Sequence, residues 1–150
     1  MAKSRGDAFA AATHTRKNGP ENPHGDTAVI YEGELGVIAR FVKDCPDLET
    51  GGDLFGFWTH TGSPVIQYVL GPGKAAKHEN TAFYQESAFL QSAGAALHDC
   101  HGLQHMGTWH SHHHLSLREP SRGDSSTMQH AIDKNRFSGW LLMICNFSEV

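Results

Sequence analysis

The chain has 150 residues, 39% of them hydrophobic, and a formal net charge of −4, which predicts one globular domain long enough to bury a core. No apolar run is long enough to cross a membrane, and no block of lysine and arginine is available to bind nucleic acid. Three cysteines without CxxC spacing argue against a disulfide scaffold and favour a reducing, cytoplasmic location.

The first 26 residues contain Gly, Pro and Asn and show no hydrophobic periodicity. Such a composition predicts a disordered or loosely attached tail over residues 1–26. An arm that binds a partner is the alternative. The folded domain is expected to cover residues 27–150.

The first half of this domain predicts a short strand, a helix and a hairpin. The strand covers 28–31, and the helix runs from about 32 to 44 because its apolar residues fall at helical spacing: Leu35, Ile38, Phe41 and Val42. Two strands, at 53–59 and 64–70, flank a turn and are expected to pair.

The second half predicts four elements, in order a helix at about 84–99, a strand at 103–109, a helix beginning near 121 and a strand at 139–144. Gly102 stands where a glycine ends a helix in the left-handed conformation. The alternation of strands and helices predicts an α/β or α+β domain in which helices flank a mixed sheet.

Twelve histidines are the compositional outlier, and two of them follow the strand at 103–109. Because residues i and i+2 of a strand point to the same face, His110 and His112 would direct both imidazoles to one point. Asp124, in the first turn of the next helix, could return a carboxylate there. Two His and one Asp with room for water describe an open catalytic zinc site.

A hydrolytic zinc site also needs a carboxylate that accepts the proton of the attacking water. Glu49 is the best candidate, because it precedes Gly51 and Gly52 at the mouth of a strand. A surface carboxylate in a polar loop is the alternative reading of this position.

Three separated blocks of the sequence resemble the JAMM motif of the JAB/MPN metalloproteases. They are Glu49-Thr50-Gly51-Gly52-x-Leu54-x-Gly56, Gly107-x-Trp109-His110-Ser111-His112 and Pro120-Ser121-x-x-Asp124. The resemblance covers roughly residues 28–146 and is greatest to the compact bacterial JAB deubiquitinases. It implies a single JAB/MPN domain with a cytidine-deaminase-like sandwich of sheet and helices.

The resemblance implies a role for each matched residue. His110, His112 and Asp124 would bind Zn²⁺ with water as the fourth ligand, and Glu49 would be the general acid and base. Ser121 would donate a hydrogen bond to the oxyanion, although it is also placed to cap the following helix.

The implied activity is cleavage after the carboxyl-terminal glycine of ubiquitin or a ubiquitin-like protein, either from a conjugate or from an extended precursor. Activating and conjugating enzymes encoded in the same operon, in a bacterial antiphage setting, would be the partners. A non-catalytic MPN-like scaffold with a structural metal is the alternative, and intact Glu49 and Ser121 argue against it.

The sequence departs from the family pattern after the second ligand. His113 stands where the family has proline, and the loop 113–120 is one residue longer than usual. His113 or His114 could therefore touch the metal. Family members also continue with further strands after the one at 139–144, so a partner could cover that sheet edge. A second metal site at His98, Cys100, His101 and His105 is less favoured than solvated side chains.

Overall fold

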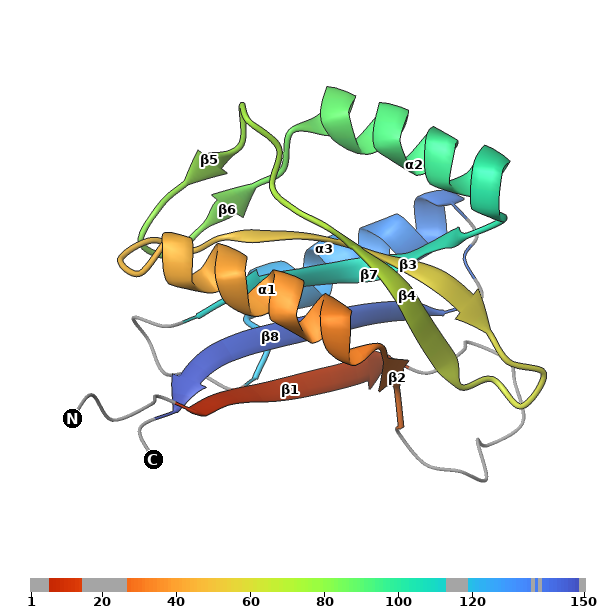
Figure 1. Ribbon diagram of the computed structural model, residues 1–150, viewed down its shortest axis with the longest axis horizontal. Coiled ribbons are helices and arrows are strands. Elements are labelled where there is room, and N and C mark those ends of the chain that lie inside the picture. The colour runs from red at the N-terminus through yellow and green to blue at the C-terminus, as the bar shows by residue number, and fades with distance from the viewer. Residues whose placement is uncertain (1–5, 15–26, 113–118, 136, 138, 149–150) are drawn as a thin grey trace.

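The computed structural model describes residues 6–14, 27–112, 119–135, 137 and 139–148. Strands and helices follow in the order β1 (Gly6–His14), β2 (Val29–Ile30), α1 (Glu32–Asp44), β3 (Gly51–Trp58), β4 (Pro64–Leu70), β5 (Lys77–His78), β6 (Phe83–Tyr84), α2 (Ser87–His101), β7 (Gln104–Ser111), α3 (Arg122–Asn135) and β8 (Trp140–Ser148). The fold is an α+β domain, as the sequence predicts (Figure 1). Within the described residues, no helix is both long and apolar enough to span a membrane.

One mixed sheet has the strand order β1-β8-β7-β3-β4-β2, and a separate two-stranded hairpin pairs β5 with β6. β7 runs parallel to β8 and antiparallel to β3. This order places the end of β7, the start of β3 and the end of β8 next to one another. The predicted metal-binding histidines and Glu49 belong to that corner of the sheet.

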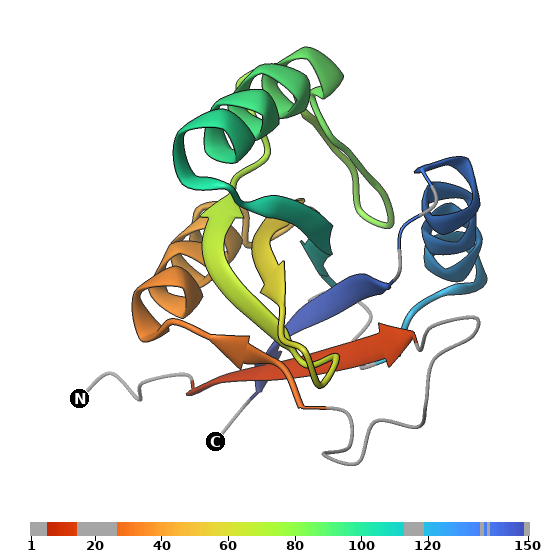
Figure 2. The same cartoon turned by 90° about the vertical axis from the view of Figure 1, so that its right-hand side faces the viewer.

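The helices lie on both sides of the sheet (Figure 2). On one side, Ile38 and Val42 of α1 pack on a cluster that includes Trp109, which is fully buried. The spacing that predicts α1 therefore also identifies its buried face. On the other side, α2 packs on Phe55 and Leu70, while α3 packs through Met128 on β8.

Three features differ from the sequence prediction. Residues 6–14, assigned to the tail, form β1 and pair antiparallel with the outer edge of β8, from Gly6 opposite Ser148 to His14 opposite Trp140. The edge expected to need a partner is therefore covered by the chain itself, and an uncovered edge would present unpaired backbone groups. The rest of the predicted tail lies outside the described residues.

The second difference is the hairpin β5–β6, where a polar loop and the first turn of a helix are expected. The backbone nitrogen of Glu79 donates to Ala82 at 2.9 Å and closes the turn. The helix α2 consequently starts at Ser87 and extends to His101. Gly102 ends it at φ 66°, with its nitrogen donating to the carbonyl of His98, as predicted.

The third difference concerns strand limits, because β3 begins at Gly51 and β7 continues to Ser111. Gly51 and Gly52 thus lie inside the sheet. A Cβ on Gly51 would come within 2.7 Å of the Phe83 ring, and one on Gly52 within 2.8 Å of the Trp109 indole nitrogen. The two glycines allow the hairpin and the core to approach the start of β3 closely.

Candidate metal centre

A groove on the side of the sheet that carries α2 and α3 contains all five predicted site residues. It has a volume of about 610 Å³, and its lining comes mainly from the hairpin β5–β6, the start of α2, the first turns of α3 and the adjoining strands. Its lining includes all of the predicted site: Glu49, His110, His112, Ser121 and Asp124. The structure therefore brings together residues that are separated by up to 75 positions in the chain (49 to 124).

Backbone hydrogen bonds on both sides fix the strand end that carries the histidines. The nitrogen of Ser111 donates to the carbonyl of Thr50 on the β3 side at 2.8 Å, and the nitrogen of His112 donates to the carbonyl of Cys145 on β8 at 3.1 Å. Alternation along the strand sends Trp109 into the core and turns both imidazoles into the groove. This orientation was predicted from the i, i+2 spacing.

Helix capping orients the third predicted ligand, Asp124. The backbone nitrogen of Ser121 donates to Oδ2 of Asp124 at 2.7 Å, and the nitrogen of Asp124 donates to Oγ of Ser121 at 3.1 Å. This reciprocal arrangement is a capping box at the first turn of α3. Ser121 Oγ accepts in its capping bond, and its hydroxyl proton can be donated to the Asp124 carboxylate or to a group in the groove.

The ligand atoms have the spacing of a metal site. Nε2 of His110 lies 2.8 Å from Nε2 of His112 and 3.4 Å from Oδ1 of Asp124, and Nε2 of His112 lies 3.6 Å from Oδ2 of Asp124. A tetrahedral ion with bonds of about 2.0–2.1 Å holds its ligands about 3.3 Å apart. The three side chains can therefore bind a metal ion after small shifts of their positions. His110 is 9% exposed and His112 4% exposed, while Asp124 is partly buried.

Glu49 is held beside this cluster by its backbone. Its nitrogen donates to the carbonyl of Glu79 at 2.8 Å, and its carbonyl accepts from Nδ1 of His78 at 3.1 Å, so both bonds come from the β5–β6 hairpin. The residue is only 5% exposed, which excludes the reading of a surface carboxylate.

The electrostatic environments of the two carboxylates differ. Burial raises the pKa of the Glu49 carboxyl above its usual range, while the charge of His110 opposes this and that of Asp124 adds to it. Burial also tends to raise the pKa of Asp124. This effect is outweighed by a hydrogen bond and the charge of His110 and by hydrogen bonds from Ser121. The pKa of Asp124 is therefore well below its usual range. Asp124 is thus ionised and suited to a cation, whereas Glu49 is suited to holding a proton.

The fully buried Ser111 is a site residue that the sequence analysis did not single out. Its Oγ accepts from the nitrogen of Thr50 at 3.0 Å and donates to the carbonyl of Thr50 at 3.4 Å. The only sequence signal is its position between the two ligand histidines. His113 and His114 lie outside the described residues, so their contact with the metal stays a prediction.

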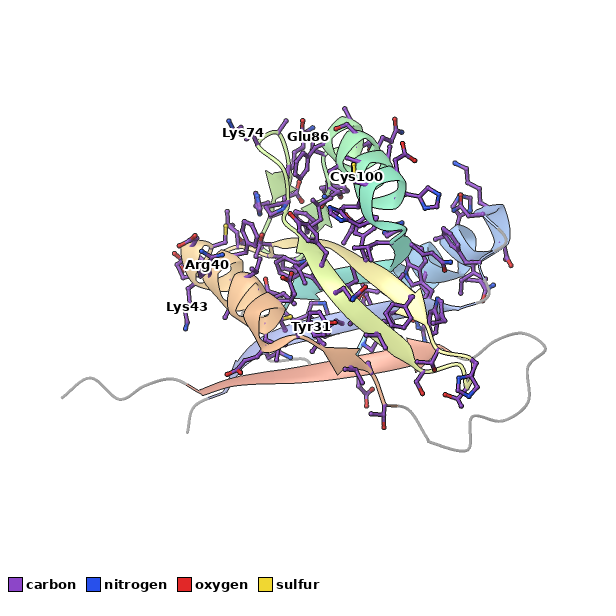
Figure 3. All side chains as sticks on the ribbon, turned by 45° about the vertical axis from the view of Figure 1, so that its right-hand side comes forward. Tyr31, Arg40, Lys43, Lys74, Glu86 and Cys100 are labelled. Atoms are coloured by element: carbon purple, nitrogen blue, oxygen red, sulfur yellow. The ribbon has the colours of Figure 1, made fainter. Side chains whose placement is uncertain are left out.

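The second metal cluster is not supported by the structure. Among the described residues, His110, His112 and Asp124 form the one group with metal-binding geometry. His98, Cys100 and His101 are exposed at the end of α2, where Figure 3 labels Cys100. His105 is engaged elsewhere, because its Nε2 donates to Oδ1 of Asp53 at 2.9 Å.

Comparisons with known proteins relate part of the sequence to a named metalloprotease and the fold to a solved structure. No known family model matches the sequence. Over 93 residues the chain is 29% identical to the "Probable metalloprotease y4qB" of Sinorhizobium fredii (strain NBRC 101917 / NGR234). This match covers 59% of this chain and 57% of that protein. The fold is similar to the solution structure of protein DSY2949 from Desulfitobacterium hafniense, with a TM-score of 0.54 and 14% identity.

That structural match covers 67% of this chain and 66% of the other, so the chain spans less than two thirds of the length of both proteins. At 14% identity the likeness to the solved structure concerns the fold alone. The relative in sequence is named a probable metalloprotease, and the His-His-Asp group of this chain has the spacing of a metal site.

Replacing a predicted ligand is expected to abolish metal binding. His110→Ala leaves one imidazole and one carboxylate, so the metal content measured by plasma mass spectrometry should fall from about one ion per chain to near zero. His98→Ala, which removes an exposed histidine of α2, is the matched control and should retain the metal. Equal metal content in both variants would contradict the assigned site.

The raised pKa of Glu49 predicts a pH-dependent effect on stability. A carboxyl with a higher pKa in the folded state than in the unfolded state stabilises the fold only while protonated, so this contribution is lost as pH rises above its usual value of 4.5 through the raised pKa. Glu49→Gln should therefore raise the melting temperature of the metal-free protein at pH 7. The gain should disappear near pH 4, and a gain that is equal at both pH values would refute the burial argument.

Proposed function

We propose that this protein is a zinc-dependent isopeptidase or peptidase of the JAMM type, which cleaves after the carboxyl-terminal glycine of ubiquitin or a ubiquitin-like protein. The observation that carries the proposal is the buried carboxyl of Glu49 beside His110, His112 and Asp124 in an open groove. A purely structural metal would need neither this carboxyl nor the open groove. The proposal accounts for both.

The donor set of two imidazoles and one carboxylate suits zinc and leaves a coordination position for water or substrate. Zinc bound there supplies Lewis acidity, which polarises a carbonyl group and lowers the pKa of a water molecule to about 7. Asp124, ionised and fixed by Ser121, would neutralise part of the charge of the ion.

Glu49 would move the proton. As the water oxygen bonds to the carbonyl carbon, the Glu49 carboxylate accepts the proton, and it returns this proton to the amine nitrogen when the C–N bond breaks. Its raised pKa makes it a stronger base than an exposed glutamate. The Ser121 hydroxyl would donate to the carbonyl oxygen as negative charge develops there.

This chemistry requires no cysteine nucleophile. Cys145 is buried in the core, Cys45 follows α1, and Cys100 is exposed on α2 (Figure 3). None of the three lines the groove. Direct hydrolysis without an acyl-enzyme is consistent with this arrangement.

The glycine-tailed substrate is proposed from the resemblance of the sequence blocks around Glu49, His110 and Ser121 to the JAMM motif. The Phe83 ring of the hairpin packs directly on Gly51 and leaves no room there for a Cβ, so the hairpin closes on the start of β3 beside Glu49.

Glu49→Gln is expected to abolish hydrolysis and keep the metal. With a carboxyl-terminally extended ubiquitin-like precursor and with a lysine-linked conjugate as substrates, the zinc-loaded protein should cleave after the terminal glycine. The variant should be slower by about 10²–10⁴-fold, the usual contribution of a general base. Glu32→Gln, at an exposed carboxylate of α1, is the matched control.

A chelator should abolish the cleavage and added zinc should restore it. Turnover that survives both the chelator and Glu49→Gln would contradict the mechanism. A protein that binds zinc and cleaves neither substrate would instead be a scaffold.

Ser121→Ala tests the oxyanion contact. The backbone nitrogen that holds Asp124 is retained in alanine, so the metal content should change little while kcat falls by about 10²–10³-fold. Ser125→Ala removes a neighbouring exposed hydroxyl, whose bond is to the Ser121 carbonyl, and should keep most of the activity. A fall in metal content that parallels the loss of kcat would indicate a purely structural role for Ser121.

A further inference from the structure

Two acceptor oxygens in the groove are buried and have no hydrogen-bond partner in the described part of the chain: Oδ2 of Asp53 and Oε1 of Gln85. Both side chains line the cavity, and Asp53 is only 2% exposed. A buried carboxylate oxygen without a donor is costly and uncommon in a native protein. The two atoms therefore indicate that a donor from another molecule completes this part of the groove.

A β-bulge in β7 explains why only one carboxylate oxygen of Asp53 has a hydrogen-bond donor. Leu54 pairs with Gly107, whereas the next residue, Phe55, pairs with His105, so Met106 is an extra residue in β7. Strict alternation would place His105 on the face of Trp109, but the bulge turns it to the opposite face, where its ring contacts Phe55 and Trp140. Its Nε2 then donates to Oδ1 of Asp53 at 2.9 Å, which leaves the buried Oδ2 without a donor.

Gln85 lies at the same end of the groove. Its amide nitrogen donates to the carbonyl of Gly71 at 3.1 Å, and Gly71 follows Leu70, the residue that pairs with Asp53 in the sheet. Because the nitrogen is engaged, the remaining group of Gln85 is an acceptor. Both unpaired oxygens are therefore acceptors, and a ligand that donates hydrogen bonds would satisfy them.

The surroundings favour a cationic donor with an apolar stem. No lysine or arginine of the described residues lines the cavity, whereas Glu49, Asp53 and Asp124 do. The wall of the groove includes Trp140, whose ring contacts that of His105, the hydrogen-bond partner of Asp53, at a centroid distance of 4.9 Å. A long basic side chain can pack its methylenes on such a wall and direct its charged end to a carboxylate.

We propose that Asp53 and Gln85 form a subsite that binds a lysine or arginine side chain of the peptide substrate. The proposal deepens the proposed function and rests on it. Asp53 lies four residues after Glu49, about 13 Å along an extended chain. The basic residue of the substrate would therefore lie within about four residues of the cleaved bond, on one side of it.

Peptide binding to an inactive variant tests this subsite directly. The full chain carrying Glu49→Gln and loaded with zinc is titrated with fluorescein-labelled decapeptides that have Gly-Gly at the centre and a single arginine at each flanking position in turn. Citrulline, which has the same shape without the charge, replaces arginine in the matched set. At one position arginine should bind about 10-fold to 100-fold more tightly, the usual gain from a hydrogen bond to a charged group.

Adding Asp53→Asn should reduce that arginine-to-citrulline ratio to about one, while Asp99→Asn, which removes an exposed carboxylate of α2, should leave it unchanged. Gln85→Met is the second variant if Asp53→Asn does not fold, and it should lower the ratio. A ratio near one at every position, including a lack of any binding, overturns the subsite. A ratio that persists in both groove variants overturns it as well.

The test of the subsite can fail or succeed independently of the test of the peptidase activity. Arginine selectivity that depends on Asp53, without hydrolysis of any peptide by the unmutated protein, would retain the subsite and reject the peptidase. Hydrolysis without preference for a basic residue would retain the peptidase and reject the subsite.

Discussion

Three hydrogen bonds between Thr50 and Ser111 join the start of β3 to the end of β7, and the geometry of the site depends on them. Both residues are 1% exposed or less, so water does not compete for these bonds. Thr50 follows Glu49, and Ser111 lies between the two histidines. The junction therefore fixes the distance between the proposed base and two of the metal ligands, which a catalytic carboxylate needs.

Local hydrogen bonds position the other parts of the site around this junction. The capping box of α3 directs the Asp124 carboxylate toward the histidines, and the β5–β6 hairpin holds the backbone of Glu49 from the opposite wall. Asp124 is ionised by its contacts, whereas burial favours the protonated form of Glu49. One groove thus contains a carboxylate that is suited to binding a cation and another that is suited to exchanging a proton.

Local patterns predicted much of this arrangement. Helical spacing identified α1, and strand alternation identified the shared direction of His110 and His112. Elements that depend on distant parts of the chain could not be predicted in this way. The strand β1 forms by pairing with β8 near the other end of the chain, and its own sequence shows no strand pattern. The bulge at Met106 reverses the alternation that a sequence pattern assumes, so the contact between His105 and Asp53 could not be predicted. The two-residue strands of the hairpin carry too short a pattern to be recognised.

The central claim is that two histidines and one aspartate bind a single ion and leave a position open to water. Zinc K-edge X-ray absorption of the zinc-loaded protein tests it most directly. The account predicts two imidazole nitrogens at about 2.0–2.1 Å and oxygen neighbours at about 2.0–2.2 Å, from the carboxylate and water. A sulfur neighbour at about 2.3 Å, or four protein ligands with no water, would contradict it.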